Sequence, residues 1–137
     1  PTIMAEISSL KNQPADIDIE ALTWIKDNLE EHAVIAALPE EGNMVAYLTN
    51  KKTVADGYYL FSPSPGERLA DIDSLYTTQS EFQALDISQK YSINFILLSE
   101  KAKSHYQIDD LKYSSSKRCF DRRKYDSFGK IYQVRRC

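Results

Sequence analysis

With 137 residues, the chain is long enough for one domain around a real hydrophobic core. Its 42% hydrophobic and 27% charged residues exclude global disorder. No apolar run approaches the roughly 18 residues that a membrane-spanning helix needs. The first ten residues also lack the charged start and long apolar centre of a signal peptide. We therefore expect the chain as given to be soluble.

The beginning of the chain reads as a separate segment. Residues 1–15 resemble a linker or leading arm, and residues 16–137 form the expected single domain. Pro1 in place of Met fits removal of an initiator Met, cleavage of a signal, or a piece cut from a longer protein. We favour a piece cut from a longer protein, because both the oxidising compartment that a disulfide implies and the resemblance to a known family agree with it.

The first predicted elements are a helix and a buried strand. A helix opens at Pro14 to Asp16, with Trp24 at the margin of its buried side. The buried side is predicted from apolar residues spaced three and four positions apart, which are Leu22, Ile25 and Leu29. The short apolar run 33–38 is stopped by Pro39, which predicts a buried strand.

A second helix and strand follow. The turn 40–43 leads into a helix that ends at Asn50, and its apolar side is predicted to contain Met44, Val45 and Leu48. Residues 53–56 predict a short strand, and 58–66 a loop rich in aromatic side chains, Pro and Ser.

The second half of the domain continues the alternation. A third helix is predicted from Leu69, Ile72, Leu75 and Tyr76. A capping box of Thr78 and Glu81 predicts the start of a fourth helix. Residues 95–98 are apolar throughout and predict a strand, and 108–113 predict a short last helix. The predicted fold is an α/β layered mixed sheet with a parallel centre, flanking helices and a C-terminal antiparallel hairpin.

The two cysteines are predicted to pair across the C-terminal hairpin. Residues 127–129 suit a three-residue loop whose glycine is left-handed, which sets Asp126 opposite Lys130. In that register Cys119 faces Cys137, about 4.5–5.5 Å apart at Cα and within reach of a disulfide. The bridge would contribute roughly 3 kcal/mol and imply an oxidising compartment. The alternative is two reduced thiols that lie in register.

The hairpin is also the basic part of an otherwise acidic chain. From 117 to 137 there are eight Lys and Arg against two Asp, a net charge of +6, so the first 116 residues carry −9. Such a segment can contact phosphates of nucleic acid, lipid head groups or a lipid-linked sugar. A solvated hairpin whose charges protect the sheet edge is the simpler interpretation and the one we favour.

Motifs for catalysis and for cofactor binding are absent from the sequence. It contains no glycine-rich phosphate loop, no nucleophile elbow and no zinc-protease motif, so no cofactor is expected. His32 and His105 are far from each other and from both cysteines, so no metal site is expected either.

Candidate binding residues gather where the first two predicted strands end. Glu40 and Glu41 directly follow a buried strand, and the carboxyl ends of strands are where α/β sheets place their ligand sites. Asp56 ends the neighbouring strand in the same way. The full candidate set is Glu40, Glu41, Gly42, Asn43, Asp56, Tyr58 and Tyr59. The alternative is a purely structural role for these residues. The two glutamates would then complement the positive end of the helix dipole, and Asp56 would form a turn before Gly57.

The order of these features resembles a known family. The segments that carry the resemblance are 21–28, 33–36, Gly42, 50–56, 91–98, 119–120 and 131–135. Together they resemble the soluble C-terminal domain of archaeal and bacterial multi-spanning membrane glycosyltransferases, including the catalytic subunits of oligosaccharyltransferases. Where that family carries a Trp-Trp-Asp-Tyr-Gly motif for recognising the acceptor, this chain reads Leu38-Pro39-Glu40-Glu41-Gly42, so the motif is lacking.

The resemblance implies a function and a location. It implies a non-catalytic, periplasmic or extracellular domain of a membrane glycosyltransferase-like protein. Its partners would be the membrane-embedded portion of the same polypeptide and an acceptor or lipid-linked sugar. Two alternatives stay open. One is a free-standing interaction or nucleic-acid-binding module that uses the basic hairpin, in which aromatics interleave with basic residues. The other is a small hydrolase built on Glu40, Glu41 and Asp56.

Overall fold

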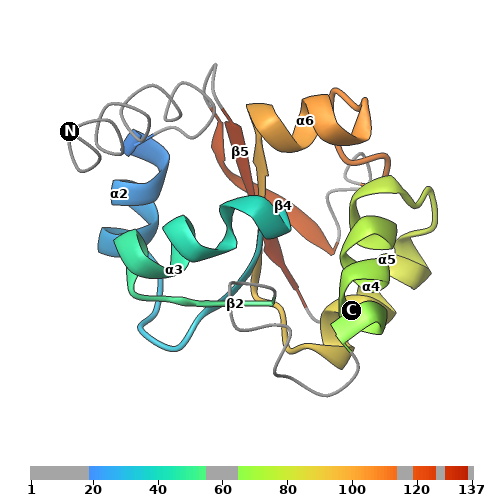
Figure 1. Ribbon diagram of the computed structural model, residues 1–137, viewed down its shortest axis with the longest axis horizontal. Helices are drawn as coiled ribbons and strands as arrows, with labels where there is room; N and C mark the ends of the chain where they lie inside the picture. The colour runs from blue at the N-terminus through green and yellow to red at the C-terminus, as the bar shows by residue number, and fades with distance from the viewer. Residues whose placement is uncertain (1–18, 55–64, 114–118, 126–128, 136–137) are drawn as a thin grey trace, which may run out of the picture.

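The fold is a three-layer α/β/α arrangement around one mixed sheet (Figure 1). The computed structural model describes residues 19–54, 65–113, 119–125 and 129–135. The strands are β1 (Val34–Ala36), β2 (Lys52–Thr53), β3 (Phe95–Ser99), β4 (Phe120–Tyr125) and β5 (Gly129–Val134). They lie in the order β2-β1-β3-β5-β4. The first three are parallel and the last two antiparallel, which confirms the predicted fold class.

Helices cover both faces of the sheet. They are α2 (Ile19–Asn28), α3 (Gly42–Thr49), α4 (Pro65–Thr77), α5 (Glu81–Lys90) and α6 (Glu100–Tyr106), with a short 3-10 helix, η2 (Pro39–Glu41), before α3. Figure 1 shows α2 and α3 on one side of the sheet and α4, α5 and α6 on the other. Within the described residues, no helix is both long enough and apolar enough to cross a lipid bilayer.

Two hydrophobic cores follow from the alternation of side chains along the strands. In β3, Phe95 and Leu97 face the core under α2 and α3, whereas Ile96 and Leu98 face the core under α4, α5 and α6. A strand covered on both faces must be apolar at every position, because successive side chains point to opposite faces. This explains why the run at 95–98 has no polar interruption.

Most predicted elements are present, with differences in detail. Leu22 and Ile25 of α2 are buried and Trp24 lies at the margin of the same core, as predicted. Asn50 ends α3 in the left-handed conformation, with φ 57°. Leu48 was predicted on the apolar side of α3, but it is exposed, as is Tyr47.

Two helix predictions were wrong in position. Ser80, not Thr78, caps α5: its hydroxyl accepts a hydrogen bond from the backbone N–H of Gln83. The last helix spans Glu100–Tyr106 rather than 108–113, because Ser99 caps it directly at the end of β3. The apolar side chains of the 108–113 segment pack as a turn instead.

The predicted register of the C-terminal hairpin was also wrong. Tyr125 pairs with Lys130, where Asp126 was predicted, and irregular pairing between Arg122 and Lys124 shifts the register by one further residue. The backbone N–H of Arg135 donates to the carbonyl of Cys119, so Arg135 faces Cys119 where Cys137 was predicted. The glycine of the predicted loop belongs to β5 and pairs with Ser99.

The disulfide therefore stays a prediction. Cys119 is buried, and no free cysteine occurs within the described ranges. Cys137 lies outside them.

Candidate functional site

The first candidate site lies where the parallel strands β1 and β3 end side by side. After β1 the chain passes through η2 into α3 on one face of the sheet, and after β3 it enters α6 on the other face. Neighbouring strands whose connections leave to opposite faces form the switch point at which open α/β sheets bind ligands. We refer to Glu40, Glu41, Ser99 and Lys101 as the β1–β3 junction.

Glu41 and Ser99 join the two strand ends. Glu41 is only 1% exposed, and its Oε1 accepts a hydrogen bond of 2.5 Å from the hydroxyl of Ser99. The same hydroxyl accepts from the backbone N–H of Ala102 and so starts α6. Ser99 thus couples the turn after β1 to the helix after β3.

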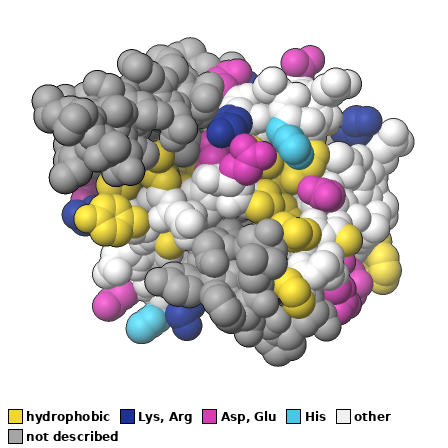
Figure 2. All heavy atoms as spheres, viewed as in Figure 1, with side chains coloured by type: hydrophobic (Ala, Val, Ile, Leu, Met, Phe, Trp, Pro, Cys, Tyr) yellow, Lys and Arg dark blue, Asp and Glu magenta, His cyan; other side chains and the backbone are white. Residues whose placement is uncertain are grey.

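Glu40 is the exposed member of the acidic pair. Its carboxylate lies 3.3 Å from the ammonium of Lys101, and its side chain is 59% exposed. Tyr106 lies near enough that the charge of Glu40 contributes to raising its pKa, after burial and a hydrogen bond to Asp73. Figure 2 shows acidic, basic and histidine side chains together on this face, between α3 and α6. Glu40 is therefore the acid that an external partner can reach.

Tyr76 closes the floor beneath the junction. Its hydroxyl, fully buried, lies 2.6 Å from the carbonyl of Leu97 and 3.2 Å from that of Ala36, so it spans β1 and β3. Burial, and then the charge of Glu41, raise the pKa of Tyr76 well above its usual value. The ring of Tyr106 stacks on Tyr76 at 4.9 Å. The floor is rigid and neutral at physiological pH.

The other candidate residues divide into two groups. Gly42 is buried as the first residue of α3, and Asn43 is exposed beside it. Asp56, Tyr58 and Tyr59 lie outside the described residues. The structure thus brings four of the seven candidates to one place.

The geometry suits recognition better than hydrolysis. A general base must reach the proton that it removes, and the carboxylate of Glu41 is sealed beneath Ser99. Ser99 is itself 2% exposed. In the part of the chain that is described, no group of acidic, histidine or cysteine side chains could hold a metal ion.

Sequence reasoning missed Ser99, Lys101 and Tyr76. Ser99 had one usable signal, because a serine directly after a buried strand and before Glu100 is a good helix cap. Lys101 then follows from the helix that Ser99 starts. Tyr76 had no such signal in the sequence, because the residues whose carbonyls its hydroxyl contacts lie 21 and 40 positions away along the chain.

Basic residues of the hairpin are engaged within the domain. Asp110 lies 3.0 Å from Lys130 and 3.3 Å from Arg122, and Asp121 lies 2.6 Å from Arg135. A phosphate would have to compete with these carboxylates. This favours the interpretation of the hairpin as a structural element.

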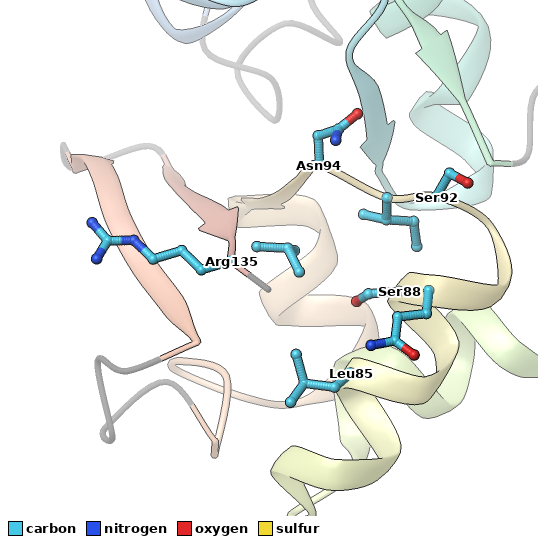
Figure 3. Close-up of a pocket in the computed structure, with 8 residues that line it drawn as sticks. Leu85, Ser88, Ser92, Asn94 and Arg135 are labelled. Atoms are coloured by element: carbon cyan, nitrogen blue, oxygen red, sulfur yellow. The ribbon is translucent and has the colours of Figure 1, made fainter. Parts of the chain in front are cut away.

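A hollow also lies away from the junction. A groove of about 470 Å³ lies at the opposite end of β3, between α5 and the end of β5 (Figure 3). We refer to it as the α5 groove. Its lining residues are Leu85, Ser88, Gln89, Ser92, Ile93, Asn94, Val134 and Arg135.

Comparison with known proteins gives a likeness of fold. No family model matches the chain, and no curated protein sequence does. The structure is similar to a crystal structure of the C-terminal globular domain of an oligosaccharyltransferase from Archaeoglobus fulgidus, with a TM-score of 0.63 and 20% identity. The match covers 85% of this chain and 95% of that one. At this identity the likeness establishes the fold alone.

Proposed function

We propose that the chain is a non-catalytic, extracytoplasmic domain of a membrane glycosyltransferase-like protein. Its direct partner is the membrane-embedded portion of the same polypeptide, and its role is to help place an acceptor or lipid-linked sugar. The observation that carries this proposal is the shared fold over 95% of the archaeal domain. The segments quoted from the sequence support it independently.

The arrangement of the β1–β3 junction fits a domain that recognises rather than reacts. Glu40 and Asn43 are exposed there, on a base fixed by Glu41 and Ser99. An exposed carboxylate at a rigid strand end can accept hydrogen bonds from an acceptor or from the membrane portion. The same edge of the sheet is a standard ligand site in α/β folds.

An extracytoplasmic location also agrees with the proposed Cys119–Cys137 bridge. Disulfides persist in oxidising compartments and are rare in the cytosol. The absence of a free cysteine among the described residues supports the bridge.

Replacing Glu40 by Ala in the whole protein is expected to impair sugar transfer without unfolding this domain. Glu40 is exposed, and its surface ion pair with Lys101 contributes at most about 1 kcal/mol to stability. A contact at an interface between domains is worth enough that its loss lowers transfer about fivefold or more. The measurement is transfer of a labelled sugar in isolated membranes, together with the melting temperature of the isolated chain.

The matched control is Glu31→Ala, which removes an exposed glutamate at the other end of β1. It should leave both transfer and melting temperature unchanged. Equal transfer by the Glu40→Ala protein and wild type would exclude the β1–β3 junction as a contact site.

A further inference from the structure

A large apolar side chain stands in solvent beside the α5 groove. Phe82, in the first turn of α5, is 81% exposed. Residues three and seven positions later on a helix lie on the same face, and here these are Leu85 and Gln89, which both line the groove. Figure 3 shows Leu85 at one end of the groove and Asn94 at the other. Phe82 therefore lies about one helical turn outside the groove, beyond Leu85.

The groove is large enough for an aromatic ring and has apolar walls. A cavity of about 150 Å³ is enough to bind benzene, and the groove measures about 470 Å³. Leu85, Ile93 and Val134 supply apolar surface from three different segments, and all three pack on the core under α4, α5 and α6. The backbone N–H of Val134 also donates to the carbonyl of Asn94, which ties two walls together. The groove is therefore formed before anything binds.

The same helix thus carries a projecting ring and the wall of a hollow that fits it. In a two-fold dimer, a residue on one side of the axis faces the residue that lies equally far on the other side. If two copies of α5 pack antiparallel about an axis between Leu85 and Asp86, each Phe82 faces the second copy's Gln89. The rings then lie over the two grooves, since Gln89 is a lining residue. This surface is self-complementary.

A two-fold contact between copies uses this surface more completely than the alternatives. It covers both rings and fills both grooves in one closed contact, whereas a head-to-tail contact leaves one ring and one groove free at the ends of a growing chain. An extended peptide could not add to the sheet through Asn94, because its backbone groups are already bonded to Val34 and Val134.

We propose that two copies of this chain form a two-fold dimer in which the Phe82 ring of each copy occupies the α5 groove of the other. This dimer uses neither the β1–β3 junction nor the membrane portion of the proposed function, so failure of one proposal leaves the other standing. The contact is small, and it brings the exposed Asp86 of each copy close to the axis, where the like charges repel. We therefore expect a dissociation constant of about 0.1 mM that falls when salt screens this repulsion.

Sedimentation equilibrium of the 137-residue chain, from about 10 µM to about 2 mM, tests the dimer directly. The average mass should rise from 15.7 kDa toward twice that value as the concentration passes the dissociation constant. Over the same range, NMR of the isotope-labelled chain should show the backbone amides of 82–94 shifting, while those of α3 stay constant. A mass of 15.7 kDa at every concentration, or a mass that keeps rising beyond the dimer, would overturn the proposal.

Phe82→Ala should weaken the dimer about a hundredfold, roughly tenfold for each of the two rings that it removes. The side chain is exposed in the monomer, so the fold and the helix should be unchanged. Tyr47→Ala is the matched control, since it removes an even more exposed aromatic ring, 86%, from α3 on the other face of the sheet. It should leave the dissociation constant within about twofold of wild type. Equal effects of the two substitutions would contradict the proposed contact.

Mixing two variants tests whether the ring enters the groove. Gln89→Glu keeps Phe82 but places a carboxylate where the second copy's ring lies, which should weaken the dimer of that variant about as strongly as Phe82→Ala does. In an equimolar mixture, the Phe82 ring of the Gln89→Glu copy meets the unaltered groove of the Phe82→Ala copy. One of the two contacts is restored, so the mixed dimer should form about tenfold more tightly than the dimer of either variant alone. No gain on mixing would show that Phe82 makes its contact outside the groove, and the proposal would fail.

Discussion

Replacing Glu41 by Ala should destabilise the domain by about 3 kcal/mol, whereas the same change at Glu40 should cost less than about 1 kcal/mol. The two glutamates are adjacent in sequence and identical in chemistry, yet one is 1% exposed and the other has a 59% exposed side chain. The difference in stability therefore reports the buried position of Glu41 and its hydrogen bond from Ser99.

The size of the effect at Glu41 comes from two sources. A hydrogen bond to a charged group contributes about 1.5–3 kcal/mol, and Ser99 would lose one. Removing the buried Cγ methylene group adds roughly 0.8 kcal/mol, before any cavity is counted. Glu41→Gln keeps the shape and an acceptor for Ser99, so it should be milder than Glu41→Ala.

Urea unfolding followed by far-UV circular dichroism measures both variants under the same conditions. A Glu41→Ala protein as stable as the Glu40→Ala protein would mean that Glu41 is not sealed beneath Ser99. In that case Glu41 would return to the set of accessible site residues.

Replacing Asp110 by Asn should cost about 2 kcal/mol at pH 7. Asp110 accepts hydrogen bonds from the hydroxyl of Tyr132 and from the backbone N–H of Leu111, and it pairs with Lys130. The side chain of Lys130 is only 11% exposed, so removing the carboxylate charge leaves an ammonium with little water around it. These contacts fasten the turn after α6 to the C-terminal hairpin.

This loss of stability should depend on pH. Burial alone would raise the pKa of Asp110, but hydrogen bonds from Tyr132, Lys130 and Leu111 outweigh it and hold the pKa below its usual value. A lowered pKa in the folded state means that the carboxylate stabilises the fold above the unfolded pKa, near 4. That contribution is lost as the pH falls through the lower, folded value. The gap between wild type and Asp110→Asn should therefore be full at pH 7 and shrink below about pH 4.

Asp109→Asn is the matched control, since it changes the same charge at an exposed neighbour. It should alter the free energy of unfolding by less than about 0.5 kcal/mol at any pH. Equal losses from the two substitutions, or a loss from Asp110→Asn that does not vary with pH, would contradict the role of Asp110.

The sequence predicted the parts of the fold that depend on local apolar pattern. Residues 33–38 and 95–98 are apolar because both faces of their strands are covered, and such runs are readable without a structure. The stripe of Leu22 and Ile25 on α2 is readable for the same reason. The order of these segments then favours a parallel centre.

What the sequence could not predict depends on contacts between distant residues. Glu40 and Glu41 look equivalent in sequence, and only Ser99, 58 residues after Glu41, makes one of them structural. The irregular pairing between Arg122 and Lys124 likewise changes the register of the hairpin, and no residue type there predicts this irregularity. The sequence thus located Glu40 and Glu41 at the end of β1, but it did not distinguish the buried glutamate from the exposed one.

The central claim, that this chain is a domain of a membrane glycosyltransferase-like protein, is tested most directly by an immunoblot of fractionated native cells. The antibody is raised against the 137-residue chain, and the membranes are washed with carbonate to remove peripheral proteins. We expect a band far larger than 15.7 kDa that stays in the washed membrane fraction. A band near 15.7 kDa in the soluble fraction alone would contradict the claim, and the likeness to the archaeal domain would then be one of fold only.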